Sequence, residues 1–379
     1  MNVLHYINNL RREGAQVMVA NLVTARDKSQ INYSVCVRQP GGSLVAELCE
    51  QGIDVAEPAQ YFGFRSMRQS VRYLKQICIE KQIHVIHAHM ADAAFLGYLV
   101  ARKLRLPLVV SHHGLEILEC NPVCRFVYYV LLNLAVRYAE VNIAVSPAVA
   151  ERVRRLFRLK EQRVQVIGNG VPVPDDSQIK AKQGMKENRS SSPTLISVGR
   201  LVPLKGQRQL IYAVAQLVSY FPDIRLYIVG GGEMEQELRH LAENNNVGRC
   251  IVFTGAVDDV AAYLSQADIY VSSSRIEGMP VSVLEAMAWQ IPVVASDIPG
   301  NKSVVRQGET GFLYELDNIG DLVEKIIEIV KNPEFATLVA LGARSMVAQK
   351  YSAAASEENY AQLYQRILGQ VPTGFHHGK

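Results

Sequence analysis

Short runs of β-branched residues alternate with longer stretches of helical spacing along most of this chain. In the first half, strand-like runs span residues 3–6, 33–37, 85–87, 108–111 and 142–145, and helical spacing is clearest over 70–80 and 91–103. This alternation is typical of crossover connections, which place successive strands parallel in a sheet and cover the sheet with helices. The sequence therefore predicts an α/β protein with doubly wound parallel sheets.

The alternation stops once and then starts again, which predicts two domains. Residues 171–193 are rich in Pro, Asp, Lys and Ser, a composition typical of a linker. Strand-like runs return at 194–198, 225–229, 250–253, 269–272 and 292–295. We therefore expect Rossmann-like domains over 1–170 and 194–350, joined by a linker over 171–193. A helix within 351–379 should pack on the first domain and end in a frayed tail.

Charge is distributed unevenly along the chain. Residues 1–170 carry 21 Lys and Arg against 13 Asp and Glu, a net charge of +8, and the remainder carries −4. A basic first domain favours an anionic partner, such as a lipid-linked diphosphate or the membrane surface that carries it. A solvated basic face without a partner is the alternative. We expect no nucleic-acid partner.

The sequence shows no apolar run of roughly 18 residues, the length needed to span a bilayer, and its first residues resemble a strand and not a signal peptide. We therefore expect a cytoplasmic protein, at most peripheral at the inner face of the membrane. Residues 124–138 and 149–160 are both apolar and basic at helical spacing and could dock on that membrane. Core helices with arginines that extend to solvent are the alternative.

Two glutamates bracket a predicted turn near residue 280. A buried-strand run at 269–272 precedes the turn, Gly278 and Pro280 fix it, and a helical run follows. Ligands of doubly wound domains bind beyond the carboxyl ends of the strands, so this turn is a candidate site. Glu277 could hydrogen-bond sugar hydroxyls there, and Glu285 could accept from a ribose. Two solvated carboxylates at a helix start are the alternative.

A second candidate group follows the strand-like run at 194–198. Arg200 supplies a planar guanidinium and Lys205 a mobile point charge, so together they could neutralise a diphosphate without a metal. Gly199 and Gly206 would let the backbone approach closely. A surface Arg–Lys pair is the alternative.

A glycine run at 230–232 also follows a strand-like run. It resembles part of the dinucleotide fingerprint, but Glu235 occupies the third glycine position and no acidic partner follows at the right distance. We interpret it as a loop that a nucleotide base or ribose approaches, with a plain tight turn as the alternative.

Five histidines cluster in the first domain: His84, His87, His89, His112 and His113. The last four end two predicted strands, and we interpret His84 as structural. We expect no metal, because no carboxylate stands at a ligand spacing such as that of the HExxH motif. The unit His113-Gly114 is the functional candidate, with the imidazole donating to a substrate hydroxyl. After the first strand, the amides at a helix start near Gly14 could touch a phosphate or a sugar.

Four groups of residues together closely resemble glycosyltransferase family 4: Glu277 to Glu285, Gly199-Arg200 with Lys205-Gly206, His113-Gly114, and the stretch 286–311. The resemblance covers essentially the whole chain. The resemblance implies a GT-B fold, with two facing Rossmann-like domains, a cleft between them and a C-terminal helix that crosses back to the first domain. It also implies sugar transfer from a nucleotide donor with retention of anomeric configuration, usually without a metal.

The resemblance also assigns residue roles. Arg200 and Lys205 would bind the donor diphosphate, Glu285 the ribose, and His113 would lie beside the donor sugar and acceptor. The remaining implied donor contacts are Gly14 near the phosphates, Val257 at the base, and Glu277 with the backbone of Gly278, Met279, Pro280 and Val281 at the sugar and phosphates. Catalysis would rest on Glu277 and His113.

Two positions depart from the family pattern. Many members have Gly-Gly-Ala-Glu after the first strand, whereas this chain has Glu13-Gly14-Ala15-Gln16, and Lys302 follows Asn301 where many members carry a glutamate.

We expect a transferase that moves a hexose or N-acetylhexosamine from a UDP-linked donor to a lipid-linked or saccharide acceptor in surface-glycan biosynthesis. A sugar-nucleotide epimerase or a silent nucleotide-sugar binder of the same fold is the alternative. A nicotinamide oxidoreductase is a weaker one, because the glycine fingerprint is incomplete.

Overall fold

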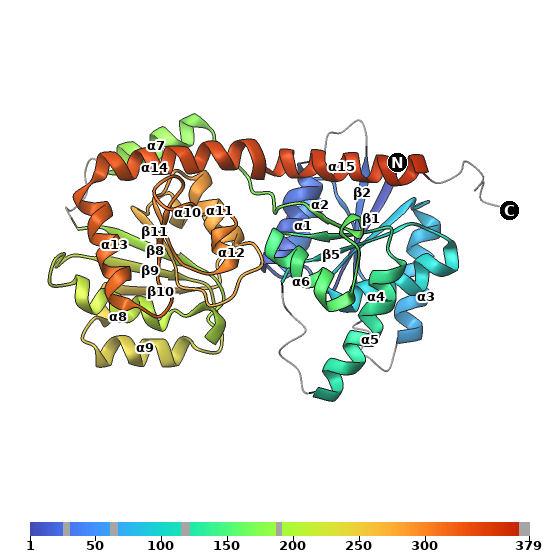
Figure 1. Cartoon of the computed structure of the whole chain (residues 1–379), viewed down its shortest axis with the longest axis horizontal. Coiled ribbons are helices and arrows are strands. Elements are labelled where there is room, and N and C mark those ends of the chain that lie inside the picture. The colour runs from blue at the N-terminus through green and yellow to red at the C-terminus, as the bar shows by residue number, and fades with distance from the viewer. Residues whose placement is uncertain (26–30, 61–66, 115–121, 187–191, 371–379) are drawn as a thin grey trace. The chain divides into compact units, whose positions relative to one another are not determined.

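The computed structural model describes residues 1–25, 31–60, 67–114, 122–186 and 192–370. The chain divides into two compact units, coloured along the sequence in Figure 1. The first unit is Met1–Gly170 with Ala353–Lys379, and the second is Val171–Ser352. The expected frayed tail, residues 371–379, lies outside the described residues.

The described part of the first unit holds a seven-stranded parallel sheet in the order β3-β2-β1-β4-β5-β6-β7. Its strands are β1 (Asn2–Ile7), β2 (Asn32–Val37), β3 (Asp54–Ala56), β4 (Val85–His89), β5 (Leu108–His112), β6 (Val141–Ala144) and β7 (Val164–Val166). Its helices are α1 (Gly14–Thr24), α2 (Leu44–Glu50), α3 (Met67–Glu80), α4 (Ala91–Leu104), α5 (Pro122–Tyr138), α6 (Pro147–Phe157) and α15 (Ala353–Gln370), with a 3₁₀ turn at Glu161–Arg163. The strand order reverses between β1 and β4, which makes their carboxyl ends the topological switch point where such sheets bind ligands.

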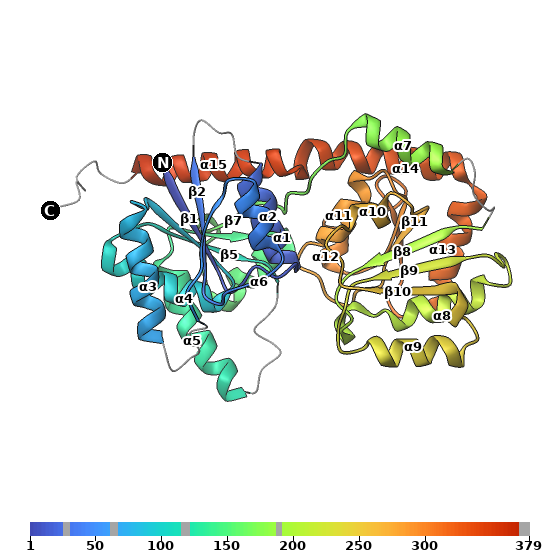
Figure 2. The ribbon, with the colours of Figure 1, turned by 180° about the vertical axis from the view of Figure 1, so that it is seen from behind.

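Helix α15 closes the first unit although it comes last in the sequence. Tyr360, Tyr364 and Ile367 are buried at helical spacing, so one face of the helix joins the core around the sheet. Polar contacts fix its register, since the Tyr33 hydroxyl on β2 donates to Glu357 Oε1 at 2.9 Å. In the two opposite views of Figures 1 and 2 the helix lies beside β2.

The described part of the second unit holds a six-stranded parallel sheet in the order β10-β9-β8-β11-β12-β13. Its strands are β8 (Thr194–Val198), β9 (Arg225–Val229), β10 (Ile251–Gly255), β11 (Ile269–Ser272), β12 (Val293–Ser296) and β13 (Phe312–Tyr314). Its helices are α7 (Asp176–Lys186), α8 (Arg208–Leu217), α9 (Glu235–Asn244), α10 (Ala261–Leu264), α11 (Val281–Ala288), α12 (Pro299–Lys302), α13 (Ile319–Lys331) and α14 (Pro333–Met346), with 3₁₀ turns at Pro203–Lys205 and Gly248–Cys250 and a π-helical turn at Val347–Tyr351. Here the switch point lies between β8 and β11.

The segment 171–193, expected as a linker, contains helix α7 and belongs to the second unit. Asp175 accepts hydrogen bonds from the Ser177 hydroxyl and the Gln178 amide at 2.6 and 2.9 Å, as a residue that starts a helix does. Ile179 is buried, and Arg344 of α14 pairs with Asp176 at 3.1 Å. The polar composition that predicted a linker is therefore the composition of a capped surface helix.

Among the described residues, none of the helices is both long enough and apolar enough to cross a membrane.

Candidate active site

Two loops meet at the switch point of the second unit. One follows β8 and carries Arg200 and Lys205, and the other follows β11 and carries Glu277. Both strands are parallel and hydrogen-bonded neighbours, so their carboxyl ends open at the same edge of the sheet. The structure therefore gathers the two strongest sequence candidates of this unit in one place.

An ion pair joins the two loops. Lys205 Nζ donates to Glu277 Oε1 at 2.5 Å, and the Ser274 hydroxyl donates to the same oxygen at 2.7 Å. The Glu277 side chain is 14% exposed and the Lys205 side chain 24%, so the pair is largely enclosed but reachable from one side. A charged hydrogen bond in such surroundings holds both groups in fixed positions before any ligand binds.

Two close backbone contacts fix the same loops. An added Cβ on Gly206, whose φ is +65°, would lie 2.2 Å from the Ser273 carbonyl oxygen. An added Cβ on Gly300, at the start of α12, would lie 2.4 Å from the Glu277 carbonyl oxygen and 2.6 Å from the Glu277 Cβ. Only glycine permits these approaches, so the positions of Lys205 and Glu277 depend on three loops packed at backbone distance.

Arg200 is exposed, and in the described part of the chain no ion pair engages its side chain. Its backbone is held instead, since Gln207 Nε2 donates to the Arg200 carbonyl at 2.8 Å. Added Cβ atoms on Gly230 and Gly232 would lie 2.2 Å from the Gly199 oxygen and 2.4 Å from the Leu201 oxygen. The glycine run at 230–232 thus lets the turn after β9 pack on the Arg200 loop, a role that the sequence pattern did not indicate.

Helix α11 begins at Val281 and carries the second glutamate one turn further, at Glu285. The buried Tyr270 hydroxyl donates to Ser282 Oγ at 2.8 Å and ties the start of α11 to β11. Burial raises the pKa of Tyr270, and the charges of Glu277 and Glu285 raise it further. The Tyr270 hydroxyl therefore stays protonated and holds the start of α11 on β11.

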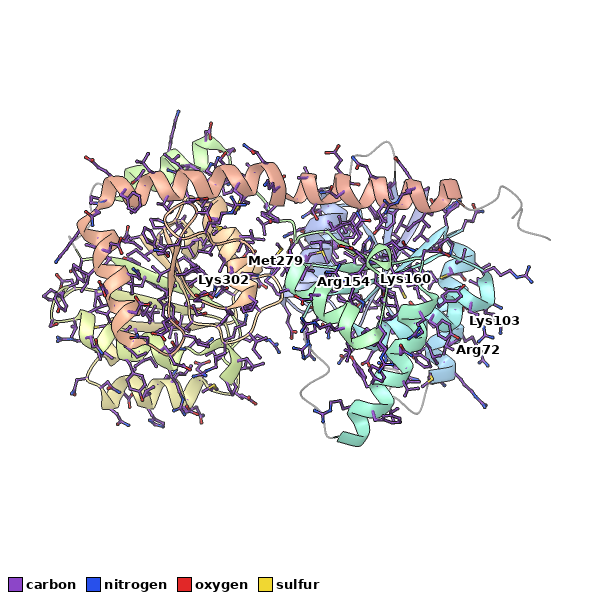
Figure 3. The ribbon with its side chains drawn as sticks, viewed as in Figure 1. Arg72, Lys103, Arg154, Lys160, Met279 and Lys302 are labelled. Carbon is purple, nitrogen blue, oxygen red and sulfur yellow. The ribbon has the colours of Figure 1, made fainter. Side chains whose placement is uncertain are left out.

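The other predicted donor contacts of the second unit follow the carboxyl ends of β10 and β11. Gly278, Met279 and Pro280 are buried in the turn before α11, and Val257 is half-buried two residues after β10 ends. Lys302 is exposed and pairs with Asp297 at 2.6 Å. Figure 3 labels Met279, in the turn after β11, and Lys302, at the end of α12.

Gly14 lies at the first residue of α1 in the first unit, exposed and with open space around its Cα. Glu13 stands at the cap position without a side-chain capping bond. Gln16 is buried, and its Nε2 donates to Asn9 Oδ1 at 3.1 Å, which also accepts from the Arg11 amide. The residue that departs from the family pattern at position 16 therefore holds the loop between β1 and α1.

His113 directly follows β5, and its Nε2 is 3.1 Å from His89 Nδ1. Its Nδ1 is enclosed and has no partner among the described residues. Burial lowers the pKa of His113 to about 3, and the neighbouring His112 lowers it further. The ring is therefore neutral at pH 7, with one N–H and one bare nitrogen.

Sequence reasoning missed two parts of this geometry. Ser274 contacts Glu277 directly, but a serine after a strand carries no distinctive signal. Met90, between β4 and α4, adopts φ +69°, which is rare for a residue with a side chain and marks the switch point of the first unit. Methionine gives no sequence signal for that conformation, whereas a glycine would have indicated it.

Comparisons with known proteins decide the family. Residues 12–173 match the family described as Glycosyltransferase Family 4, and residues 178–345 match the family described as Glycosyl transferases group 1. The chain belongs to glycosyltransferase family 4.

A solved structure has the same fold. HepE from Anabaena, solved in complex with UDP-glucose, superposes with a TM-score of 0.81 at 23% identity, covering 97% of this chain and 100% of that chain. The family 4 chain described here is therefore a GT-B glycosyltransferase with two Rossmann-like units and a C-terminal helix.

Two relatives of this family 4 enzyme are named for different reactions. The UDP-Gal:alpha-D-GlcNAc-diphosphoundecaprenol alpha-1,3-galactosyltransferase of Escherichia coli is 26% identical over 270 residues, 69% of this chain and 70% of that protein. The N-acetyl-alpha-D-glucosaminyl L-malate synthase of Bacillus anthracis is 23% identical over 311 residues, 79% of each chain.

Proposed function

We propose that this enzyme transfers a hexose or N-acetylhexosamine from a UDP-sugar to a saccharide or lipid-linked acceptor, with retention of anomeric configuration. The observation that carries the proposal is the Lys205–Glu277 ion pair at the switch point, in a loop that also carries the exposed Arg200. UDP-glucose in the HepE structure and the UDP-galactose named for the Escherichia coli relative support the donor class.

The chemistry requires two kinds of charge stabilisation. Sugar transfer leaves negative charge on the departing diphosphate and builds positive character at the anomeric carbon. Arg200 and Lys205 would bind the diphosphate, and Glu277 with the start of α11 would orient the sugar. Glu285 would accept from the ribose, and Val257 would contact the base through its backbone. We propose that no metal takes part, because two cations would already neutralise the leaving group.

Turnover measurements test this proposal. The enzyme is incubated with labelled UDP-glucose, UDP-galactose and UDP-N-acetylglucosamine, and release of UDP is followed. We expect activity to fall at least about a hundredfold in Glu277→Ala and Arg200→Ala. Glu243→Ala and Arg249→Ala are matched controls, because both residues are exposed on elements before β10, at the amino end of that strand. Unchanged turnover in Glu277→Ala and Arg200→Ala would refute the proposal.

The epimerase alternative predicts a different product. An NMR spectrum of the donor after incubation without acceptor would then show inversion at a ring carbon, whereas our proposal predicts only the original sugar, released or transferred. A thermal-shift screen identifies the donor beforehand, since a ligand present at 100 times its Kd raises the stability by about 2.7 kcal/mol.

We propose further that the first unit meets a membrane through α5 and α6. Four apolar side chains of α5 are exposed: Phe126 (68%), Val127 (44%), Val130 (40%) and Leu134 (44%). Tyr129 of α5 stacks on Phe157 of α6, so the two helices adjoin. The stretch 152–160 adds five cations, of which Arg154 and Lys160 are labelled in Figure 3. An exposed apolar helix beside cations suits an anionic lipid surface, where a lipid-linked acceptor would be found.

Cosedimentation with phosphatidylglycerol vesicles tests this contact. Phe126→Ser should reduce the bound fraction several-fold, because the exposed ring would no longer enter the lipid interface. Leu338→Ser is the matched control, since Leu338 is 67% exposed on α14 of the second unit. Equal binding by both variants and the unaltered chain would contradict the α5–α6 contact.

A further inference from the structure

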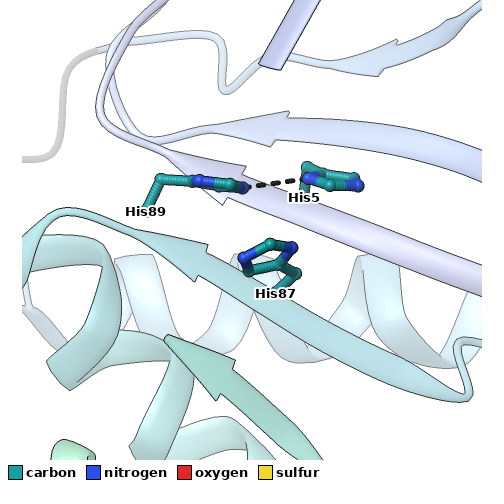
Figure 4. A group of neighbouring side chains, drawn as sticks. All are labelled: His5, His87 and His89. Carbon is teal, nitrogen blue, oxygen red and sulfur yellow. Dashed lines mark hydrogen bonds between the residues drawn. The ribbon is translucent and has the colours of Figure 1, made fainter. Parts of the chain in front are cut away.

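Three neighbouring strands of the first unit each supply one histidine to a continuous chain of rings. His5 lies on β1, His89 ends β4, and His113 follows β5. His5 Nδ1 is 2.9 Å from His89 Nε2, and His89 Nδ1 is 3.1 Å from His113 Nε2. Figure 4 shows the first of these contacts and the ring of His87 beside it. We call His5, His89 and His113 the histidine chain.

A metal site is the first reading to weigh, because nitrogens of His5, His87 and His89 lie within 4.8 Å of one another. Both nitrogens of His87 already have partners, Tyr364 Oη at 2.6 Å and Ser111 Oγ at 2.7 Å. Both nitrogens of His89 are bonded within the histidine chain. A metal ion would take one nitrogen from each ring and so break at least one hydrogen bond of His87 and one of His89, and the geometry therefore favours hydrogen bonding.

The number of protons in the histidine chain is fixed. Burial is the main cause that lowers the pKa of His5 and of His113 to about 3 and the pKa of His89 well below its usual value. Each ring is therefore neutral at pH 7 and carries one N–H. Two of the three N–H groups form the two internal hydrogen bonds. The third must lie at one end, on His5 Nε2 or on His113 Nδ1.

The surroundings of His5 decide between the two ends. Its Nε2 is fully buried and has no partner among the described residues, and the rings of Tyr33 and His87 pack against it. A buried N–H without an acceptor is rarer in proteins than an acceptor without a donor. His5 is fully buried, whereas His113 is half-buried at the end of β5, so an acceptor from a bound ligand can reach only His113. The bare nitrogen therefore belongs on His5, and the free N–H belongs on His113.

We propose that His5 and His89 are positioning residues that hold His113 as its Nδ1–H tautomer, so that His113 Nδ1 donates a hydrogen bond to an oxygen atom of the substrate. The substrate contact rests on the proposed glycosyl transfer, whereas the tautomer does not. His113 Nδ1 is enclosed and has no partner among the described residues, which leaves a donor there for a sugar hydroxyl or a phosphate oxygen.

The tautomer is measured by long-range ¹H–¹⁵N NMR on the full chain labelled at histidine, without substrate. Signals are assigned with His113→Gln, and His112 provides an internal contrast. His112 Nε2 faces Asn142 Oδ1 at 3.3 Å, and the Asn142 amide nitrogen is directed to the carbonyl of Val136. We therefore expect Nε2–H on His112 and Nδ1–H on His113. An Nε2–H signal from His113 would overturn the proposal.

An isosteric pair of variants tests the role of His5. His5→Asn keeps a donor near the position of Nδ1 and should preserve the His113 tautomer. His5→Asp offers an acceptor instead, so His89 and His113 should both reverse, and kcat/KM should fall roughly tenfold in a variant that still folds cooperatively. Nδ1–H on His113 in both variants would overturn the proposal. Failure of the proposed function is a separate result, absence of turnover by the unaltered enzyme with any UDP-sugar.

Discussion

Replacing Gly300 by alanine should displace the site glutamate without changing any charged group. The added Cβ would lie 2.4 Å from the Glu277 carbonyl oxygen and 2.6 Å from the Glu277 Cβ. Ordinary van der Waals contact begins near 3.4 Å, so the two loops must separate by about 1 Å. Neither of these atoms is the far end of a flexible side chain, so the backbone itself must move.

The displacement has two measurable consequences. Overpacking of this kind costs about 1–3 kcal/mol of unfolding free energy. A shift of about 1 Å in a positioning group can lower the rate about a hundredfold. We therefore expect Gly300→Ala to lower kcat/KM for the UDP-sugar about a hundredfold while its melting temperature falls by a few degrees.

Gly248→Ala is the matched control in the same unit. Its added Cβ would meet Glu243 Cγ at 3.6 Å, an ordinary contact, so activity should stay within a factor of two or three of the unaltered enzyme, a difference of about 0.6 kcal/mol. A folded Gly300→Ala enzyme with the activity of the control would refute the reasoning that the position of Glu277 controls transfer.

Three further predictions concern the two units separately. Arg200→Lys should weaken UDP binding about tenfold in calorimetry, because an ammonium cannot match the guanidinium's two parallel hydrogen bonds to a phosphate. Tyr364→Phe should lower the unfolding free energy in urea by about 1–3 kcal/mol, since the buried His87 Nδ1 would lose its hydrogen bond to the Tyr364 hydroxyl. The unfolding free energy should also decrease as the pH is lowered below about 6.5. The unfolded chain then binds protons at histidines that stay neutral in the folded protein, where burial lowers the pKa of His5 to about 3 and that of His112 to about 4. Each such histidine contributes up to about 1.4 kcal/mol per pH unit, and His112→Asn should reduce the slope between pH 6.5 and 5.

Most of the architecture could be predicted from the sequence, because long periodic segments carry their own signal. The strand-like runs at 33–37, 194–198 and 225–229 coincide with β2, β8 and β9 within one residue. Strands β3, β7 and β13 were missed, since each has three residues, too few to show a period. The change to a Pro-, Asp- and Lys-rich composition after residue 170 marked the end of the first unit. That composition could not distinguish a linker from the capped surface helix α7.

The candidate site was predictable in its charged residues and not in their arrangement. Lys205 and Glu277 were predicted as site residues because both are charged and both follow predicted strands, and parallel strands bring their carboxyl ends to one edge of the sheet. The sequence did not indicate that these two side chains hydrogen-bond to each other or that Gly206 and Gly300 determine their positions. Both features depend on the close approach of backbone segments from loops that are far apart in the sequence. The order of the histidine chain likewise depends on which strands are neighbours, as His5 and His89 show.

The most direct test of the central claim is a crystal structure of the enzyme soaked with UDP. We predict the diphosphate at the switch point between β8 and β11, within hydrogen-bonding distance of Arg200 and Lys205, with the ribose at Glu285. Density for UDP elsewhere on the chain, with no contact between phosphate and Arg200 or Lys205, would contradict the account.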